Sequence, residues 1–136
     1  MTVSTTVTDQ RGWFKATITG AAGTTGGAIG SFANPEGVLL GITRAFFYFR
    51  TGSTGAANLS VGVAATATTS DADLFGTSDC IEATVGGKMV YGPTAQIAVT
   101  QNPVTLWTST TYVTVTGSGS TVGLDADLYL EYIRLA

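Results

Sequence analysis

Apolar and polar residues alternate with a period of two along much of the chain, which is the pattern of strands that bury one face. The segment 43–50 shows it most clearly: Ala45, Phe47 and Phe49 share one face, and the residues between them share the other. The same alternation predicts further strands over 13–19, 58–64, 95–100, 104–107, 112–116 and 125–134. In the last of these both faces carry apolar residues, which indicates a strand inside the fold or against a partner.

The connections between these strands favour a sandwich with crossing loops. Residues 51–57 have the composition of a turn and predict a hairpin between strands 43–50 and 58–64. Loops 20–30 and 66–82 are long for hairpins, and only residues 71–75 suggest a single helical turn. The expected fold is therefore all-β, a single antiparallel β-sandwich of about eight strands with jelly-roll-like crossings. We expect this domain over residues 11–136, after an N-terminal arm over 1–10.

Composition supports strands and excludes several chemistries. The 25 Thr residues and many Val and Gly are poor helix formers. The chain has no His, which excludes Ser-His-Asp and Cys-His catalysis and His-ligated metals. Cys80 is alone, so neither an intrachain disulfide nor a cysteine-based zinc site can form. We expect no enzyme and no cofactor.

Charge is scarce, at 11% of residues against about 25% in ordinary domains. The six Lys and Arg residues are scattered along the sequence, which argues against nucleic-acid binding. The most apolar stretch, 37–49, is interrupted by Thr43 and Arg44 and is too short to span a membrane. The polar N-terminus lacks the pattern of a signal peptide, so synthesis in the cytoplasm is expected.

The acidic residues offer two further hypotheses. Asp-Ala-Asp-Leu occurs at 71–74 and at 125–128, and paired carboxylates of this kind can bind Ca²⁺. The complete calcium-loop pattern is missing, so turn capping by Asp71, Asp73, Asp125 and Asp127 is the favoured interpretation. A glycosidase-like pair among the carboxylates, including Glu36, Glu82 and Glu131, is the corresponding enzyme alternative.

Aromatic residues divide between the two faces of the predicted strands. Phe14, Phe47 and Phe49 are expected in the core. Residues on the opposite faces combine aromatic rings with arginines, the residue types that dominate protein interfaces. The candidate interface residues are Trp13, Arg44, Phe46, Tyr48, Arg50 and Tyr129. An alternative is a sugar-stacking platform built on Trp13 or Trp107.

Several segments together resemble a known class of virion proteins. They are Ile42–Ala45, Thr51–Ala57, Val61–Ala65, Asp73-Leu74, Thr114–Gly117 and Tyr129–Ile133. In these strands and turns the chain resembles the β-sandwich head-decoration (auxiliary capsid) proteins of tailed bacteriophages, over roughly residues 29–134. The resemblance implies a jelly-roll-like protein that binds the major capsid protein on the outer surface of the head shell and stabilises it, commonly as a homotrimer. It transfers no catalytic or ligand-binding residue to this chain.

The scarcity of charge fits such a protein. A free monomer with so few charges and with aromatic residues on both strand faces would be poorly soluble, whereas neighbours in an assembly would cover those faces. The alternative function is a carbohydrate-binding β-sandwich module of a phage tail fibre or adhesin, which predicts an exposed Trp beside Asp or Asn.

Overall fold

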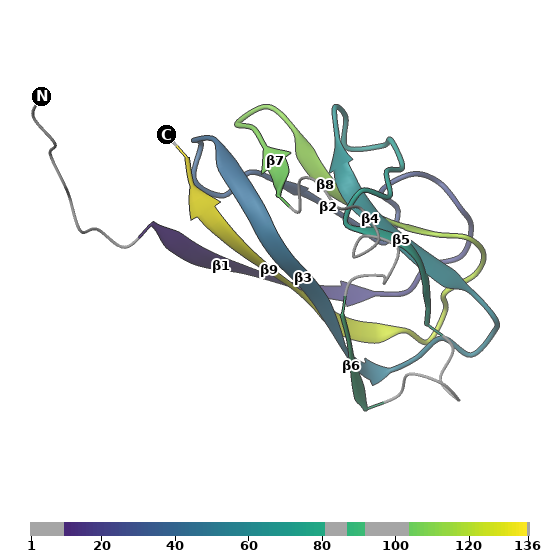
Figure 1. Cartoon of the computed structure of the whole chain (residues 1–136). Coiled ribbons are helices and arrows are strands. Elements are labelled where there is room, and N and C mark those ends of the chain that lie inside the picture. Colours follow the sequence, from purple (N-terminus) through teal and green to yellow (C-terminus); the bar gives the residue numbers. More distant parts are fainter. Residues whose placement is uncertain (1–9, 81–86, 92–103, 136) are drawn as a thin grey trace, which may run out of the picture.

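The computed structural model describes residues 10–80, 87–91 and 104–135, which form nine strands in two sheets (Figure 1). Sheet A contains β1 (Arg11–Thr19), β3 (Leu40–Thr51), β6 (Lys88–Tyr91), β7 (Thr105–Trp107) and β9 (Asp125–Arg134). Sheet B contains β2 (Gly30–Ala33), β4 (Asn58–Ala64), β5 (Phe75–Asp79) and β8 (Tyr112–Gly117). Every strand pair is antiparallel, and the described residues include no helix, so the all-β sandwich predicted from the sequence is confirmed.

The order of the strands is that of a jelly roll. Sheet A runs β1-β9-β3-β6, with β7 paired to the other end of β3, and sheet B runs β2-β8-β4-β5. The pairs are nested: β1 lies beside β9, β2 beside β8, β3 beside β6 and β4 beside β5. A long hairpin whose paired arms wrap over two sheets gives this order. The jelly-roll-like crossings inferred from the long loops are therefore present.

The core lies between the sheets and follows the predicted alternation. Phe47 and Phe49 are fully buried, and Phe14 packs against the core from β1, as expected from the sequence. A β-bulge between Ile42 and Arg44 shifts the alternation of β3 by one residue. Because of this shift, the period-two pattern predicts the strand only from residue 43, whereas β3 begins at Leu40.

The hairpin predicted between segments 43–50 and 58–64 is wrong. The two strands lie in different sheets, and residues 52–57 cross between them. Ser53 in this connection is fully buried and donates its backbone N–H to the carbonyl oxygen of Cys80 at 2.6 Å. β3 and β4 each have an apolar face. In two stacked sheets these faces pack against each other, which removes both from water, whereas pairing within one sheet would leave them side by side and still uncovered.

The helical turn predicted over 71–75 is also wrong. Asp71 Oδ1 instead accepts the backbone N–H groups of Ala72 and Asp73, and Phe75 begins β5 with its ring 4.9 Å from that of Phe47. β5 lies within the segment 66–82 that the sequence predicted as a loop, and β2 begins at the end of the predicted loop 20–30, where no element was predicted. The strand predicted over 95–100 and residues 1–9 of the predicted arm lie outside the described residues.

The outer faces of the two sheets differ in how they are covered. On sheet B, Thr114 and Thr116 point away from the core but are buried by loops. Thr114 donates its hydroxyl to the carbonyl oxygen of Thr69 at 2.9 Å, and Thr116 Oγ1 accepts the N–H of Gly27 at 3.0 Å. The chain thus seals the outer face of sheet B with its own loops, whereas much of the outer face of sheet A remains exposed.

Candidate interface on the outer face of sheet A

The structure brings all six candidate interface residues to the outer face of sheet A. They lie on three adjacent strands, in the order β1, β9, β3. The register places Trp13 and Arg44 on either side of Glu131, and Phe46 directly opposite Tyr129. Their shared face was predictable from alternation alone. Their arrangement in space depends on β9 lying between β1 and β3, which the sequence did not reveal.

An aromatic trio, Trp13, Phe46 and Tyr129, forms the centre of this face. Phe46 stacks on Tyr129 with ring centroids 5.0 Å apart, and Trp13 meets Phe46 edge-on at 5.8 Å. Such pairs contribute about 0.5–1.5 kcal/mol each beyond the burial of their area. The trio is therefore a preformed platform, in which Trp13 keeps half of its surface exposed.

Cations flank the trio and bind the carboxylates between the strands. The Arg44 guanidinium lies 5.5 Å from the Trp13 ring centroid and forms a bidentate pair with Glu131 at 3.1 and 3.0 Å. Lys15 lies 5.7 Å from the ring centroid of Tyr129 and 3.8 Å from a carboxylate oxygen of Asp127. Lys15 was not among the six interface residues predicted from the sequence, so its position on the face is a structural finding.

Arg50 links β3 to β9 at the far end of the face. It binds both Asp125 and Asp127, and its hydrogen bonds lower the pKa of each carboxyl group below its ordinary value. The same pairs raise the pKa of Arg50. The hydrogen bonds from Arg44 likewise lower the pKa of Glu131. These carboxylates are ionised at neutral pH and hold the two arginines in fixed positions.

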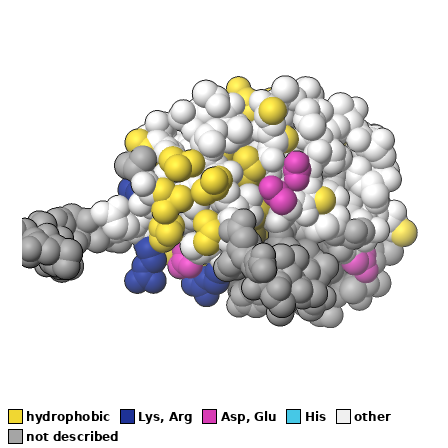
Figure 2. Space-filling view, turned by 45° about the horizontal axis from the view of Figure 1, so that its top comes forward, with side chains coloured by type: hydrophobic (Ala, Val, Ile, Leu, Met, Phe, Trp, Pro, Cys, Tyr) yellow, Lys and Arg dark blue, Asp and Glu magenta, His cyan; other side chains and the backbone are white. Residues whose placement is uncertain are grey.

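Exposed apolar side chains are concentrated on the same side of the molecule. Of the five large hydrophobic residues that the described part of the chain exposes, Trp13, Tyr48, Leu106 and Leu135 lie on or next to strands of sheet A. Figure 2 shows hydrophobic side chains gathered in one region of the surface, with Lys and Arg side chains beside them. Exposed patches of this kind mark interaction sites.

Leu106 and Leu135 belong to a second cluster at the end of the face, around Gly41. A Cβ atom at Gly41 would lie 2.7 Å from Val104 Cγ1 and 3.1 Å from Leu135 Cδ1. The glycine therefore makes room for apolar side chains that come from two separate segments, residues 104–106 and 133–135. Sequence reasoning missed this cluster because its members share no local pattern.

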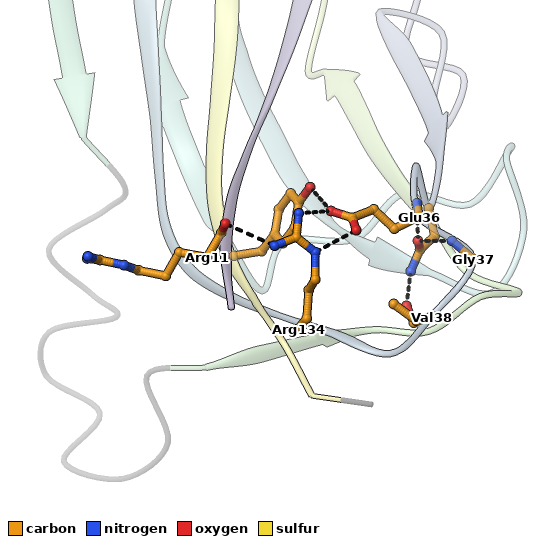
Figure 3. A network of polar contacts seen from close by, with 7 residues as sticks. Arg11, Glu36, Gly37, Val38 and Arg134 are labelled. Carbon is orange, nitrogen blue, oxygen red and sulfur yellow. Dashed lines mark hydrogen bonds and ion pairs between the residues drawn. The ribbon is translucent and has the colours of Figure 1, made fainter. Parts of the chain in front are cut away.

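A polar clamp closes the end of the sandwich where β9 finishes (Figure 3). Arg134 donates to both oxygens of Glu36, at 2.6 and 2.7 Å, and to the carbonyl oxygen of Arg11 at 3.0 Å. The Tyr132 hydroxyl donates to the same carboxylate. The hydrogen bond from Arg134, followed by that from Tyr132, lowers the pKa of Glu36. The clamp joins the turn after β2 to β1 and β9, the first and last strands of the chain.

Asn34 holds that turn in place. Its Nδ2 donates to the carbonyl oxygens of Val38 and Trp107, both at 2.8 Å. Its Oδ1 accepts the backbone N–H groups of Glu36 and Gly37, both at 2.9 Å. One side chain therefore makes four hydrogen bonds and presents Glu36 to the clamp.

The other sequence-based hypotheses find less support. Trp107 is fully buried, so its proposed role in stacking a sugar is wrong. Among the described residues, no group of three or more His, Cys, Asp or Glu side chains gathers to hold a metal ion. Asp125 and Asp127 are bound by Arg50, and Asp71 caps its own turn.

The described carboxylates that were candidates for a catalytic pair already bind other groups of the protein. Glu36 and Glu131 are each paired with an arginine, and both have a lowered pKa, the opposite of what a general acid requires. Burial raises the pKa of Asp73, which lies on the other side of the molecule and accepts the N–H of Val63. Glu82 lies outside the described residues.

Comparison with known proteins identifies a shared fold. No family model and no curated protein matches the chain. Among solved structures, the chain is similar to a chain in the capsid of Ralstonia phage GP4, with a TM-score of 0.58 and 15% identity over 100% of this chain and 92% of the other. At this identity the similarity shows a common fold. No helix in the described part of the chain is long and apolar enough to cross a membrane.

Proposed function

We propose that this chain is a structural, non-catalytic virion protein of a tailed bacteriophage. It binds the outer surface of the head shell through the outer face of sheet A and stabilises the shell by protein–protein contacts. The observation that carries the proposal is the fold shared, over the whole chain, with a chain in the capsid of Ralstonia phage GP4. The resemblance of its strands and turns to head-decoration proteins supports the decoration role in particular.

The geometry of the face suits this role. The aromatic trio and the two arginines are fixed by cross-strand pairs and ion pairs, so little side-chain entropy is lost on binding. Aromatic and Arg residues are the types that dominate binding energy at interfaces. A jelly roll sealed on its other sheet offers this face to a partner without rearrangement.

The partner in this proposal is the major capsid protein, and the protein is made in the host cytoplasm and located on the outer surface of the capsid. The resemblance to head-decoration proteins further suggests a homotrimer. Neither nucleic acid nor membrane is needed for the function.

Co-sedimentation with intact heads tests the proposal. Virions of the phage that carries the gene should contain the chain, and the purified protein should sediment with heads that lack it. Tyr48→Ala should weaken binding by about 2 kcal/mol, because Tyr48 is exposed on the candidate face. Thr24→Ala, in an exposed loop that covers sheet B, is the matched control and should bind like the wild type.

Two results would contradict the proposal. A strict monomer in light scattering that never sediments with heads excludes a decoration role. If Tyr48→Ala unfolds the protein, the residue belongs to the core instead of the interface. Circular dichroism of the variant distinguishes loss of folding from loss of binding.

A carbohydrate-binding function is the second candidate, and the half-exposed ring of Trp13 is the observation that favours it. Arg44 lies against this ring, so a sugar would stack on the remaining surface. Binding to a glycan array that is abolished by Trp13→Ala, with no binding to heads, would support this function.

A further inference from the structure

The positive charges of the chain are confined to one of the two sheets. All six Lys and Arg residues of the chain lie on strands of sheet A: two on β1, two on β3 and one each on β6 and β9. The strands of sheet B carry one charged residue, Asp79. The described loops carry carboxylates alone, Glu36, Asp71 and Asp73. A net charge of −3 therefore conceals a positive excess on sheet A.

Charges are also separated by depth within the outer face of sheet A. The side chains of Lys15 and Arg44 are 56% and 58% exposed, whereas those of their partners Asp127 and Glu131 are 5% and 12% exposed. In these two pairs, which flank the aromatic trio, the carboxylates lie low between the strands and the cations stand above them. The order is reversed at the far end of the face, where Asp125 is more exposed than Arg50. Around the trio, an approaching molecule meets the cations first, and Coulomb attraction or repulsion is set mainly by the charges nearest to it.

These cations stand on two sides of the aromatic trio, since Arg44 lies against Trp13 and Lys15 against Tyr129. A surface with an apolar centre and positive flanks is complementary to one with an apolar centre and acidic flanks. Two copies of the chain placed face to face would bring their cation layers together, so a second copy fits this face poorly.

We propose that the outer face of sheet A docks on an acidic protein surface, in which Asp or Glu residues flank an apolar patch. This inference rests on the proposed function and specifies the partner surface as an acidic region of the head shell. The loop that places Asp71 and Asp73 against β4 of sheet B is repelled by the same region, so attraction and repulsion together orient the protein with sheet B outward. Such steering acts mainly on the association rate and weakens as salt is added.

Charge variants in two matched positions test the proposal, with binding to intact heads measured by co-sedimentation at about 50 and 500 mM NaCl. Thr19→Lys adds a positive charge at an exposed position on β1, and Thr24→Lys makes the same change in an exposed loop over sheet B. Thr19→Lys should strengthen binding at low salt roughly threefold to tenfold, and Thr24→Lys should leave it unchanged. Lys15→Gln should weaken binding by a similar factor at low salt, and this difference should shrink at high salt.

The outcomes separate this inference from the proposed function. If the wild type binds heads equally at both salt concentrations, or if Thr19→Lys and Thr24→Lys act alike, the inference of an acidic partner surface is overturned while the decoration role stands. If neither the wild type nor any variant binds heads at either salt concentration, the proposed function itself fails. Retention on polygalacturonate or duplex DNA without binding to heads would also overturn the inference, because the acidic partner would then not be a protein.

Discussion

Replacing Asn34 tests whether one side chain holds the end of the sandwich together. Asn34→Ala removes four hydrogen bonds: two to the backbone N–H groups of an exposed turn, which water can replace, and two to carbonyl oxygens. One of these carbonyls belongs to Trp107, a fully buried residue. A typical hydrogen bond contributes about 0.5–1.5 kcal/mol, and an unpaired buried acceptor costs about 1–3 kcal/mol. We therefore expect a loss of about 2–4 kcal/mol.

Urea and thermal unfolding measure this loss. For a chain of 136 residues, each kcal/mol should lower the midpoint temperature by roughly 3–4 °C, so Asn34→Ala should unfold roughly 6–16 °C below the wild type. Thr24→Ala, an exposed loop substitution, is the control and should stay within about 0.5 kcal/mol.

Asn34→Asp examines the two donated bonds separately. The variant keeps the shape and the two accepted bonds, but it places a carboxylate against the carbonyl oxygens of Val38 and Trp107. At neutral pH it should be at least as unstable as Asn34→Ala, and protonation at low pH should restore part of the stability. If Asn34→Asp at neutral pH is as stable as the wild type, the donated bonds do not hold this turn and the reasoning is refuted.

Three further predictions concern the rest of the fold. Gly20→Ala should lower the free energy of unfolding in urea by at least about 2 kcal/mol, because the new Cβ would lie 1.7 Å from the carbonyl oxygen of Thr121. A Cβ at Gly55 would meet open space, so Gly55→Ala should be neutral or slightly stabilising. Equal stabilities of the two variants would contradict this prediction. Acid should destabilise the protein through the carboxylates whose pKa values are lowered by arginines, because their stabilisation is present above about pH 4.5 and is lost as pH falls through the folded-state pKa values. The urea concentration at the unfolding midpoint should therefore decrease as pH falls through that range, and this decrease should be smaller in Arg50→Gln; Asp73, whose pKa is raised, contributes in the opposite direction. A urea midpoint independent of pH would exclude this mechanism. The residues with lowered pKa are Glu36, Asp125, Asp127 and Glu131. Burial raises the pKa of Cys80, so a thiol reagent should label it slowly in the native protein and rapidly in urea; fast native labelling would show that the thiol is exposed.

Alternation in the sequence was enough to predict the faces of the long strands. Phe47 and Phe49 are in the core and Phe46 and Tyr48 are outside, because the side-chain period of a strand is independent of its partners. The same local rule failed at Thr43, where the bulge inserts one residue. Short strands such as β2 escaped notice because four residues contain too few periods to stand out.

The arrangement of the candidate face was much less predictable. Glu131 lies between Trp13 and Arg44 because of pairings that join residues more than 80 positions apart, and no local pattern encodes them. The six cations form no cluster along the sequence, yet the jelly-roll order places all of them on strands of one sheet. Residues around Gly41 came together for the same reason.

The position of β9 has a consequence for biosynthesis. This strand is the last of the nine to leave the ribosome, yet it lies in the middle of sheet A and pairs with both β1 and β3. Until it emerges, β1 lacks the strand with which it pairs, and the hydrogen bond from Arg134 to Arg11 joins residues 123 positions apart. The pairing of β3 with β6 and β7 does not need β9, but sheet A is completed only after β9 is translated. A nascent chain interrupted before that point therefore lacks the face that the finished protein presents.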